Sequence, residues 1–177
     1  RLRSESRQNR LEAELRRILA GPRPLERRLH EVCEKLCAGL GASLGELWLA
    51  ANGTLVLGGS SEAARAAGVR PDPGLVGAAA AKGRAVWLTG CGPDRRLRIA
   101  ALPLLEADRT AGVLYLQGVR EAGEEALEAQ WSAAASLLAG LLGEALAEEE
   151  TRRAARRGLQ LAEAVSALST SRDRRQA

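Results

Sequence analysis

Aromatic residues are nearly missing from this sequence. Its 177 residues include no Phe, one Tyr and three Trp, so the core must be built mainly from Leu, Ala and Val. A nucleic-acid binder more often shows a basic stripe with aromatic side chains on which bases stack. Here the net charge is only +4 and the two signs are interspersed. We therefore expect no direct nucleic-acid partner.

Long apolar runs and metal-ligating residues are also scarce. No run of about 18 apolar residues occurs, so the sequence predicts no membrane span. His30 is the single histidine, and we expect it at the surface of a helix. Cys33 and Cys37 lie four residues apart on the same helix, where we expect small buried hydrophobic residues rather than metal ligands, because no further ligands are evident. Free thiols of this kind indicate a cytoplasmic protein.

Motifs for catalysis and phosphate binding are missing as well. No G-x-S-x-G elbow joins the Ser, His and Asp residues, and no G-x-x-x-x-G-K-[ST] loop occurs. The most reactive cysteine should be Cys91, because Arg95 and Arg96 are close in sequence and would favour its thiolate. We expect no enzymatic activity in this chain.

The clearest structural pattern present is a pair of apolar runs within residues 98–118. Residues 99–105 and 111–117 are apolar, and the polar link 106–110 separates them. Two such runs joined by a short link predict a β-hairpin. A hairpin this apolar needs cover on both faces, because an isolated two-stranded ribbon is marginal in water.

The remaining elements surround this hairpin. Asn52-Gly53 is a strong sign of a second hairpin. In order, the sequence predicts a helix at 2–20, a helix at 25–40, strands at 47–49 and 54–57, short helices at 61–67 and 75–82, a strand at 85–88, the hairpin of 98–118, and a helix from 124 to about 169. This order predicts an α+β fold: an antiparallel sheet of five to six strands, helices packed on one face, and long N- and C-terminal helices.

Part of this pattern resembles a known family. The stretch GLVGAAAAKGRAVWLTG (74–90), followed by RIAALPLLEADRTAGVLYLQG (98–118) and an Ala/Leu-rich helix, resembles the GAF domain family, with Pro103-Leu104 and Gly112-Val113-Leu114 at matching places. The resemblance covers about residues 25–146. The PAS family has a similar sheet, but its domains usually lack the long helix before the sheet and the late Pro-Leu strand.

The resemblance implies a regulatory sensor domain of a bacterial multidomain signal-transduction protein. It divides the chain into an N-terminal linker or coiled-coil helix (1–22), a GAF-like domain (23–147) and a C-terminal signalling helix (148–177). That helix would lead to a further domain, such as a kinase, a cyclase or a transcription activator. GAF domains bind small ligands between the sheet and the short helices. The alternative is a ligand-free structural dimerisation module.

Six residues are candidates for the ligand pocket that the resemblance implies. They are Trp48, Trp87 and Tyr115 on predicted strands, and Cys91, Arg96 and Arg98 at the rim. Each is equally explicable as ordinary core or surface, so a real ligand site and a site filled by side chains both remain open.

The cofactors of known GAF domains fit this sequence poorly. The cyclic-nucleotide motif Asn-Lys…Phe…Asp-Glu cannot be complete without Phe. A bilin is disfavoured because Cys91 is followed by Gly92 rather than His, and haem because His30 has no evident partner ligand. Reduction of methionine sulfoxide needs several cysteines in the pocket loops, and only Cys91 lies in such a loop. We therefore expect no required cofactor.

The last helix predicts a parallel homodimer. Its apolar residues between 126 and 146 are too many for one face, and a thinner stripe continues beyond them. The predicted interface residues are Leu127, Trp131, Leu138, Leu141, Leu161, Val165 and Leu168. The N-terminal stripe of Leu11, Leu15 and Ile18 would join the same bundle if both helices leave one end of the domain.

Overall fold

The structure is a computed structural model that describes residues 2–68, 72–91, 96–107, 109–119 and 125–173. Side chains are described within 8–68, 72–90, 96–107, 109–119 and 127–164. Helices and antiparallel strands make up most of these residues. The helices are α1 (Leu2–Leu19), α2 (Leu25–Leu40), α3 (Glu62–Ala67), α4 (Pro73–Lys82) and α5 (Glu125–Asp173), and the strands are β1 (Leu44–Ala51), β2 (Thr54–Ser60), β3 (Val86–Cys91), β4 (Leu97–Glu106) and β5 (Arg109–Val119). The chain divides into two compact units, Arg1–Gly143 and Glu144–Ala177. The helix α5 contributes to both units.

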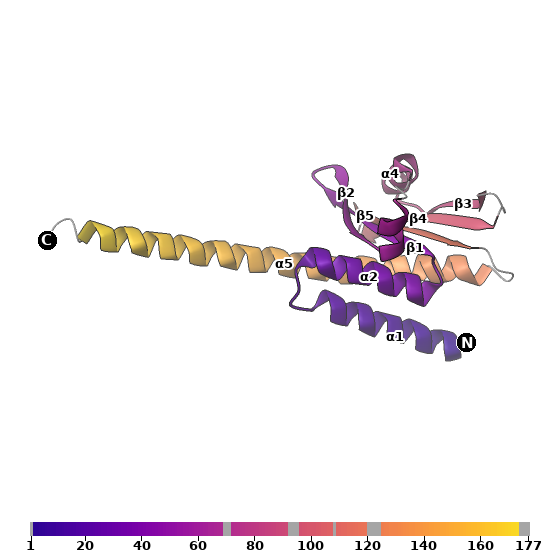
Figure 1. The fold of residues 1–177 in the computed structure, drawn as a ribbon, viewed down its shortest axis with the longest axis horizontal. Coiled ribbons are helices and arrows are strands. Elements are labelled where there is room, and N and C mark those ends of the chain that lie inside the picture. The colour runs from indigo at the N-terminus through magenta and orange to yellow at the C-terminus, as the bar shows by residue number, and fades with distance from the viewer. Residues whose placement is uncertain (1, 69–71, 92–95, 108, 120–124, 174–177) are drawn as a thin grey trace. The chain divides into compact units, whose positions relative to one another are not determined.

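The sheet lies in the first unit and has the strand order β2-β1-β5-β4-β3 (Figure 1). Every neighbouring pair is antiparallel. The predicted α+β architecture with an antiparallel sheet is therefore confirmed, and the sheet has five strands. The central strand β5 pairs both with β4, its neighbour in sequence, and with β1.

Both predicted hairpins are present. The turn between β1 and β2 consists of Asn52 and Gly53, whose φ angles of 51° and 77° are left-handed. A two-residue turn of this kind needs positive φ at both positions, which Asn and Gly tolerate best. The link between β4 and β5 contains Ala107, also with a positive φ of 52°. Local turn chemistry thus accounts for the β1–β2 hairpin.

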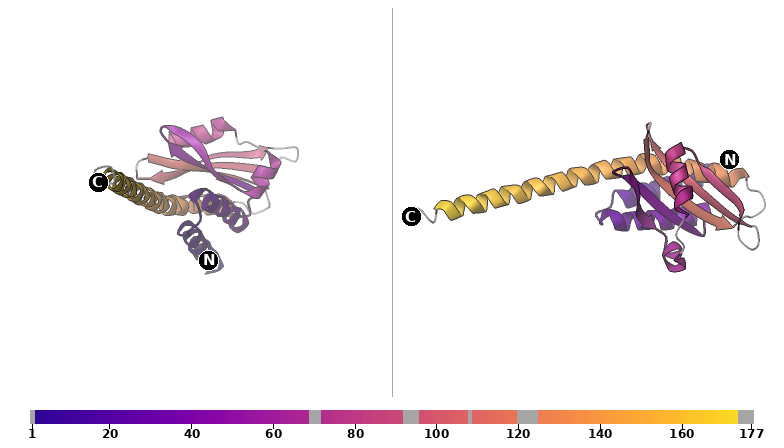
Figure 2. Two further views of the ribbon diagram at one scale, coloured as in Figure 1. Left: turned by 60° about the vertical axis from the view of Figure 1, so that its left-hand side comes forward. Right: turned by 90° about the horizontal axis from the view of Figure 1, so that it is seen from above.

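The long helices lie on one face of the sheet (Figures 1 and 2). There, α2 and the part of α5 up to Gly143 pack on the sheet, while α1 packs against α2. Leucine is the main residue of the core of this face, as the scarcity of aromatics predicts: Leu15, Leu29, Leu36, Leu47, Leu102, Leu104, Leu114, Leu116, Leu138 and Leu142 are all fully buried.

Arg28 joins α1 to α2. Its side chain is buried, and its Nη1 donates a hydrogen bond to the carbonyl oxygen of Leu19, the last residue of α1. Carbonyls at a helix C-terminus have no partner within the helix and carry partial negative charge, so a guanidinium there is favourable. The break that Gly21, Pro22 and Pro24 make in the chain is thereby closed into a fixed helical hairpin.

The other face of the sheet is covered by α4 (Figure 1). We call it the α4 face. Its buried cluster comprises Leu44, Ala64, Leu75, Val76, Ala79, Ala101, Val113 and Tyr115, with Trp48, Leu55, Ala80, Val86 and Ile99 packed around it. Ala64 belongs to α3, so both short helices contribute to the same cluster. Thr110 Oγ1 donates to the Ala80 carbonyl at 3.1 Å and ties α4 to β5.

Candidate functional site

The candidate site is the part of the α4 face around Glu46. Strand alternation turns Glu46 and Trp48 toward this face and Leu47 toward α2. In the β1–β5 register Tyr115 lies directly opposite Glu46, and Val113 lies opposite Trp48. A carboxylate, an indole and a phenol are therefore brought together from two central strands.

Glu46 is the unusual member of this group, because it is a carboxylic acid within a largely apolar cluster. It is only 5% exposed. Trp48 Nε1 donates a hydrogen bond to its Oε2 at 3.1 Å. Burial raises the pKa of Glu46, and the bond from Trp48 opposes that effect only in part. A carboxyl group in such a place either takes up a proton or needs a cation beside it.

Helix α3 is fixed next to Glu46 by Ser61. This buried serine caps the N-terminus of α3, and its Oγ accepts hydrogen bonds from Ala64 N at 3.3 Å and from Gly45 N at 3.1 Å. Ser61 N in turn donates to the Gly45 carbonyl at 2.8 Å. The start of α3 is thus bonded to the residue that precedes Glu46 on β1.

The basic residue of α3 is directed away from Glu46. Arg65 Nη1 donates to the Ser60 carbonyl at 2.6 Å and lies 3.0 Å from His30 Nδ1. Ser60 N also donates to His30 Nδ1, at 2.9 Å. His30 was predicted at the surface, but it is half-buried, because α2 packs closely on the end of β2.

Among the predicted pocket residues with described side chains, Trp48 and Tyr115 lie on the α4 face. Trp87 and Arg98 are on the opposite face, so their assignment to the same pocket was wrong. In the β3–β4 register Trp87 lies opposite Ala100 and Arg98 opposite Thr89, and alternation along these strands turns all four toward α5.

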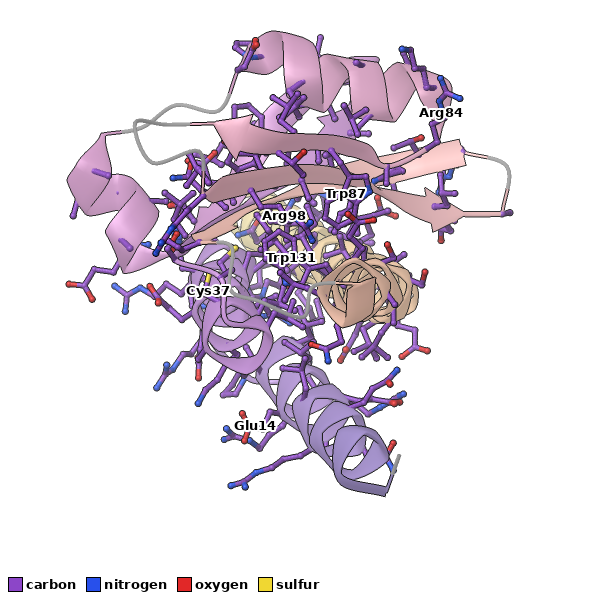
Figure 3. All side chains as sticks on the ribbon, turned by 90° about the vertical axis from the view of Figure 1, so that its right-hand side faces the viewer. Glu14, Cys37, Arg84, Trp87, Arg98 and Trp131 are labelled. Atoms are coloured by element: carbon purple, nitrogen blue, oxygen red, sulfur yellow. The ribbon has the colours of Figure 1, made fainter. Side chains whose placement is uncertain are left out.

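Trp87 and Arg98 hold α5 instead. Figure 3 shows them between the sheet and α5 together with Trp131. Trp87 stacks on Trp131 with ring centroids 5.9 Å apart and an interplanar angle of 22°. Arg98 Nη2 lies 3.5 Å from Glu128 Oε1 on the first turns of α5. Of the other two candidates, Arg96 is exposed just before β4, and the side chain of Cys91 lies outside the described residues.

Three of the predicted interface residues are buried within the first unit. Trp131, Leu138 and Leu141 face its core, so their assignment to a dimer interface was wrong. The same holds for Leu15 and Ile18 of the N-terminal stripe, which are buried in this unit as well. The reason is that the sheet and the α1–α2 hairpin together cover more of these apolar residues than a single sheet face would.

The remaining interface candidates stay available. Leu127 is half-buried, and Leu161 in the second unit is 67% exposed. The side chains of Val165 and Leu168 lie outside the described residues.

Two of the cysteines are buried free thiols, as predicted. Burial raises the pKa of both, for Cys37 to about 11, so neither supplies a thiolate near neutral pH. Within the described ranges no group of three or more His, Cys, Asp or Glu residues is placed to hold a metal ion. The described helices include none that is long and apolar enough to cross a membrane.

Sequence reasoning missed Glu46. The sign that could have revealed it is local: in Leu44-Gly45-Glu46-Leu47-Trp48 one acidic residue stands inside an apolar strand. A charged residue is seldom fully buried without a partner. Its position therefore indicated either a strand with a solvated face or a buried functional carboxylate.

The arrangement of strands and helices is shared with solved GAF domains. The GAF domain of A. aeolicus nlh2, solved in an inactive state, has 17% sequence identity, with 78% of this chain and 97% of that chain covered and a TM-score of 0.64. The GAF domain of a phosphoenolpyruvate-protein phosphotransferase from Coxiella burnetii has 20% identity, coverage of 80% and 95%, and a TM-score of 0.59. The chain has a GAF-like fold.

The same GAF-like fold occurs in an enzyme. Free methionine-R-sulfoxide reductase from Neisseria meningitidis, solved with its substrate, has 20% identity, coverage of 78% of this chain and 89% of that chain, and a TM-score of 0.55. No protein-family model and no curated protein matches the sequence. The structural likeness therefore establishes the fold and leaves the activity to be argued from the site.

Proposed function

We propose that this chain is the regulatory sensor domain of a multidomain signalling protein, which binds a small ligand on the α4 face and acts as a homodimer. The observation that carries the proposal is the buried Glu46 between Trp48 and Tyr115, because a stable core has no need of an acid there. GAF-like neighbours of regulatory type support it.

The sheet offers a direct route from the ligand to the helices. Glu46 and Trp48 of β1 face α4, while the alternate residue Leu47 is buried against the long helices. Gly59 at the end of β2 lies so close to α2 that an added Cβ would come within 2.7 Å of the Leu29 backbone. A shift of β1 and β2 is therefore passed to α2 without a soft layer of side chains between them.

The proposed dimer uses the second unit. Along α5 the residues Ala147, Thr151, Ala154, Gly158, Leu161, Val165 and Leu168 follow one another at alternating spacings of four and three. This is the spacing of a coiled-coil seam. A single helix with such a stripe gains little stability until a second helix covers it, so a second copy of the chain is the partner that we propose.

Sedimentation equilibrium of two matched variants tests the dimer. Leu159 and Leu161 are both 67% exposed, but only Leu161 lies on the seam. We expect Leu161→Arg to give the mass of a monomer at concentrations where Leu159→Arg remains dimeric. Equal masses for the two variants would refute the proposed coiled-coil seam. So would a monomeric unmodified chain at roughly tens of micromolar.

An enzymatic role is disfavoured by the two thiols that the structure describes. Cys33 and Cys37 are buried and protonated near neutral pH, whereas a reducing cysteine must reach its substrate as a thiolate. We expect the chain to leave free methionine sulfoxide unreduced in the presence of a dithiol reductant. Turnover in that assay would contradict the regulatory proposal.

A further inference from the structure

We propose that the α4 face around Glu46 takes an organic cation, namely a small ammonium ligand with a short apolar tail, whose charge pairs with the Glu46 carboxylate. This inference rests on the proposed function, because it names the ligand class for the same face.

The first step of the argument is the unfilled bonding capacity of Glu46. An ionised carboxylate can accept about four hydrogen bonds. Among the described residues Glu46 has one hydrogen-bond partner, Trp48 Nε1 on Oε2, and its Oε1 has none. An ionised carboxylate in a largely apolar surrounding is unfavourable when it is incompletely bonded, and a cation placed against it removes much of that penalty.

The second step is that the basic side chains described near Glu46 are engaged elsewhere. Arg65 is bonded to the Ser60 carbonyl on the side of α2. Arg98 lies on the opposite face of the sheet and pairs with Glu128. Within the described ranges no ion pair to Glu46 is formed. No described residue therefore supplies a cation to Glu46, and the cation that we propose comes with the ligand.

The third step concerns the size and character of the ligand. Trp48 and Tyr115 stand beside Glu46 in the register of the two central strands, and aromatic rings attract cations through their faces. The buried cluster of the same face includes the apolar residues Leu75, Val76 and Ala79 of α4. A compact aliphatic ammonium suits a carboxylate with aromatic and aliphatic neighbours, whereas an anion would be repelled by Glu46.

Three probes that differ mainly in charge test the inference. n-Butylammonium, neutral butyramide and butyrate are titrated into the native chain, and the indole N–H signals of the three tryptophans are followed by NMR. The Trp48 signal is assigned with Trp48→Phe. We expect butylammonium alone to shift the Trp48 signal in a saturable way while the Trp131 signal stays in place, because the Nε1 of Trp131 is bonded to Leu40 on the other side of the sheet.

A matched pair of variants identifies the residue. Glu46→Gln keeps the shape of the side chain and an acceptor for Trp48 but removes the charge, so butylammonium should bind it about tenfold or more weakly. Glu62→Gln removes an exposed acid on α3 and should bind butylammonium as the native chain does. Equal affinities for Glu46→Gln and the native chain would overturn the inference.

The charge selectivity of the native chain decides the question even if Glu46→Gln fails to fold. Saturable binding of butyrate or butyramide with no preference for butylammonium would refute the cation while leaving a ligand-sensing domain in place. The absence of any shift with all three probes would also refute the inference. The dimer is tested separately by Leu161→Arg, so the two proposals fail by different measurements.

Discussion

Trp131→Phe should destabilise the domain strongly, because Trp131 fixes α5 to the rest of the first unit by three kinds of contact. The side chain is fully buried, its Nε1 donates to the Leu40 carbonyl at 3.1 Å, and its ring stacks on Trp87. It also lies against the backbone of Gly118, where an added Cβ would come within 3.3 Å of the indole ring. The residue thus connects α5 with the end of α2 and with both β3 and β5.

The magnitude follows from what Phe cannot replace. Loss of the hydrogen bond leaves the buried Leu40 carbonyl without its donor, at a cost of about 1 kcal/mol. The smaller ring leaves part of the indole volume empty, which costs about 1–2 kcal/mol. Part of the stacking with Trp87 is retained, so we expect a total loss of about 2–3 kcal/mol, a large share of the stability of a small domain.

Urea unfolding followed by far-UV circular dichroism measures this loss. The comparison is made at one protein concentration, because dimer formation would stabilise the folded state at higher concentrations. We expect a lower midpoint with an unchanged slope. The control is Leu159→Ala, an exposed site, which should change the free energy of unfolding by less than about 0.5 kcal/mol. A loss for Trp131→Phe no larger than that of the control would refute the role given to this tryptophan.

Three further perturbations have expected outcomes in the same unfolding assay. Gly59→Ala should lower the free energy of unfolding by about 1–3 kcal/mol, because its Cβ would lie 2.7 Å from the backbone of α2. Gly77→Ala should raise it by about 0.5–1 kcal/mol, because no heavy atom lies within 4 Å of the added Cβ. The opposite order of the two variants would contradict the close packing of α2 on β2. Arg28→Met should lower the free energy of unfolding by about 1–3 kcal/mol, because it removes the donor to the Leu19 carbonyl. Hydrogen exchange of the α1 amides should become faster in this variant. Unchanged exchange would show that other contacts hold α1. Burial raises the pKa of Glu46 in the folded state, so stability that is present at low pH is lost as the pH rises through this folded-state pKa. Glu46→Gln should therefore gain stability relative to the native chain between mildly acidic and neutral pH. A stability difference that does not change with pH would argue against a raised pKa.

The parts of the fold that could be read from the sequence are those that local chemistry determines. Asn52 and Gly53 adopt the left-handed turn that these two residue types tolerate best, and Gly41, also left-handed, ends α2. The pairing of β1 with β5 has no such local sign, because it joins segments far apart in the chain. The resemblance to GAF domains was needed to expect the fold as a whole.

The site could be predicted only in part for a related reason. Residues 86–88 are apolar throughout, so no polar alternation shows which face Trp87 occupies. The leucines of α5 show that the helix needs cover, but the sequence does not say whether the sheet, α1 or a second chain provides it. Glu46 broke the apolar pattern of β1 and was the residue most open to detection.

The place of β5 in the sheet also governs how this chain can fold during synthesis. One edge of β1 is completed by β5, yet residues 50–111 separate the two paired segments in the chain. A chain still emerging from the ribosome therefore carries an open edge on β1 until β5 has left the exit tunnel. Fragments that stop before Arg109 should be targets for chaperones and proteases, and the domain becomes resistant only as a whole.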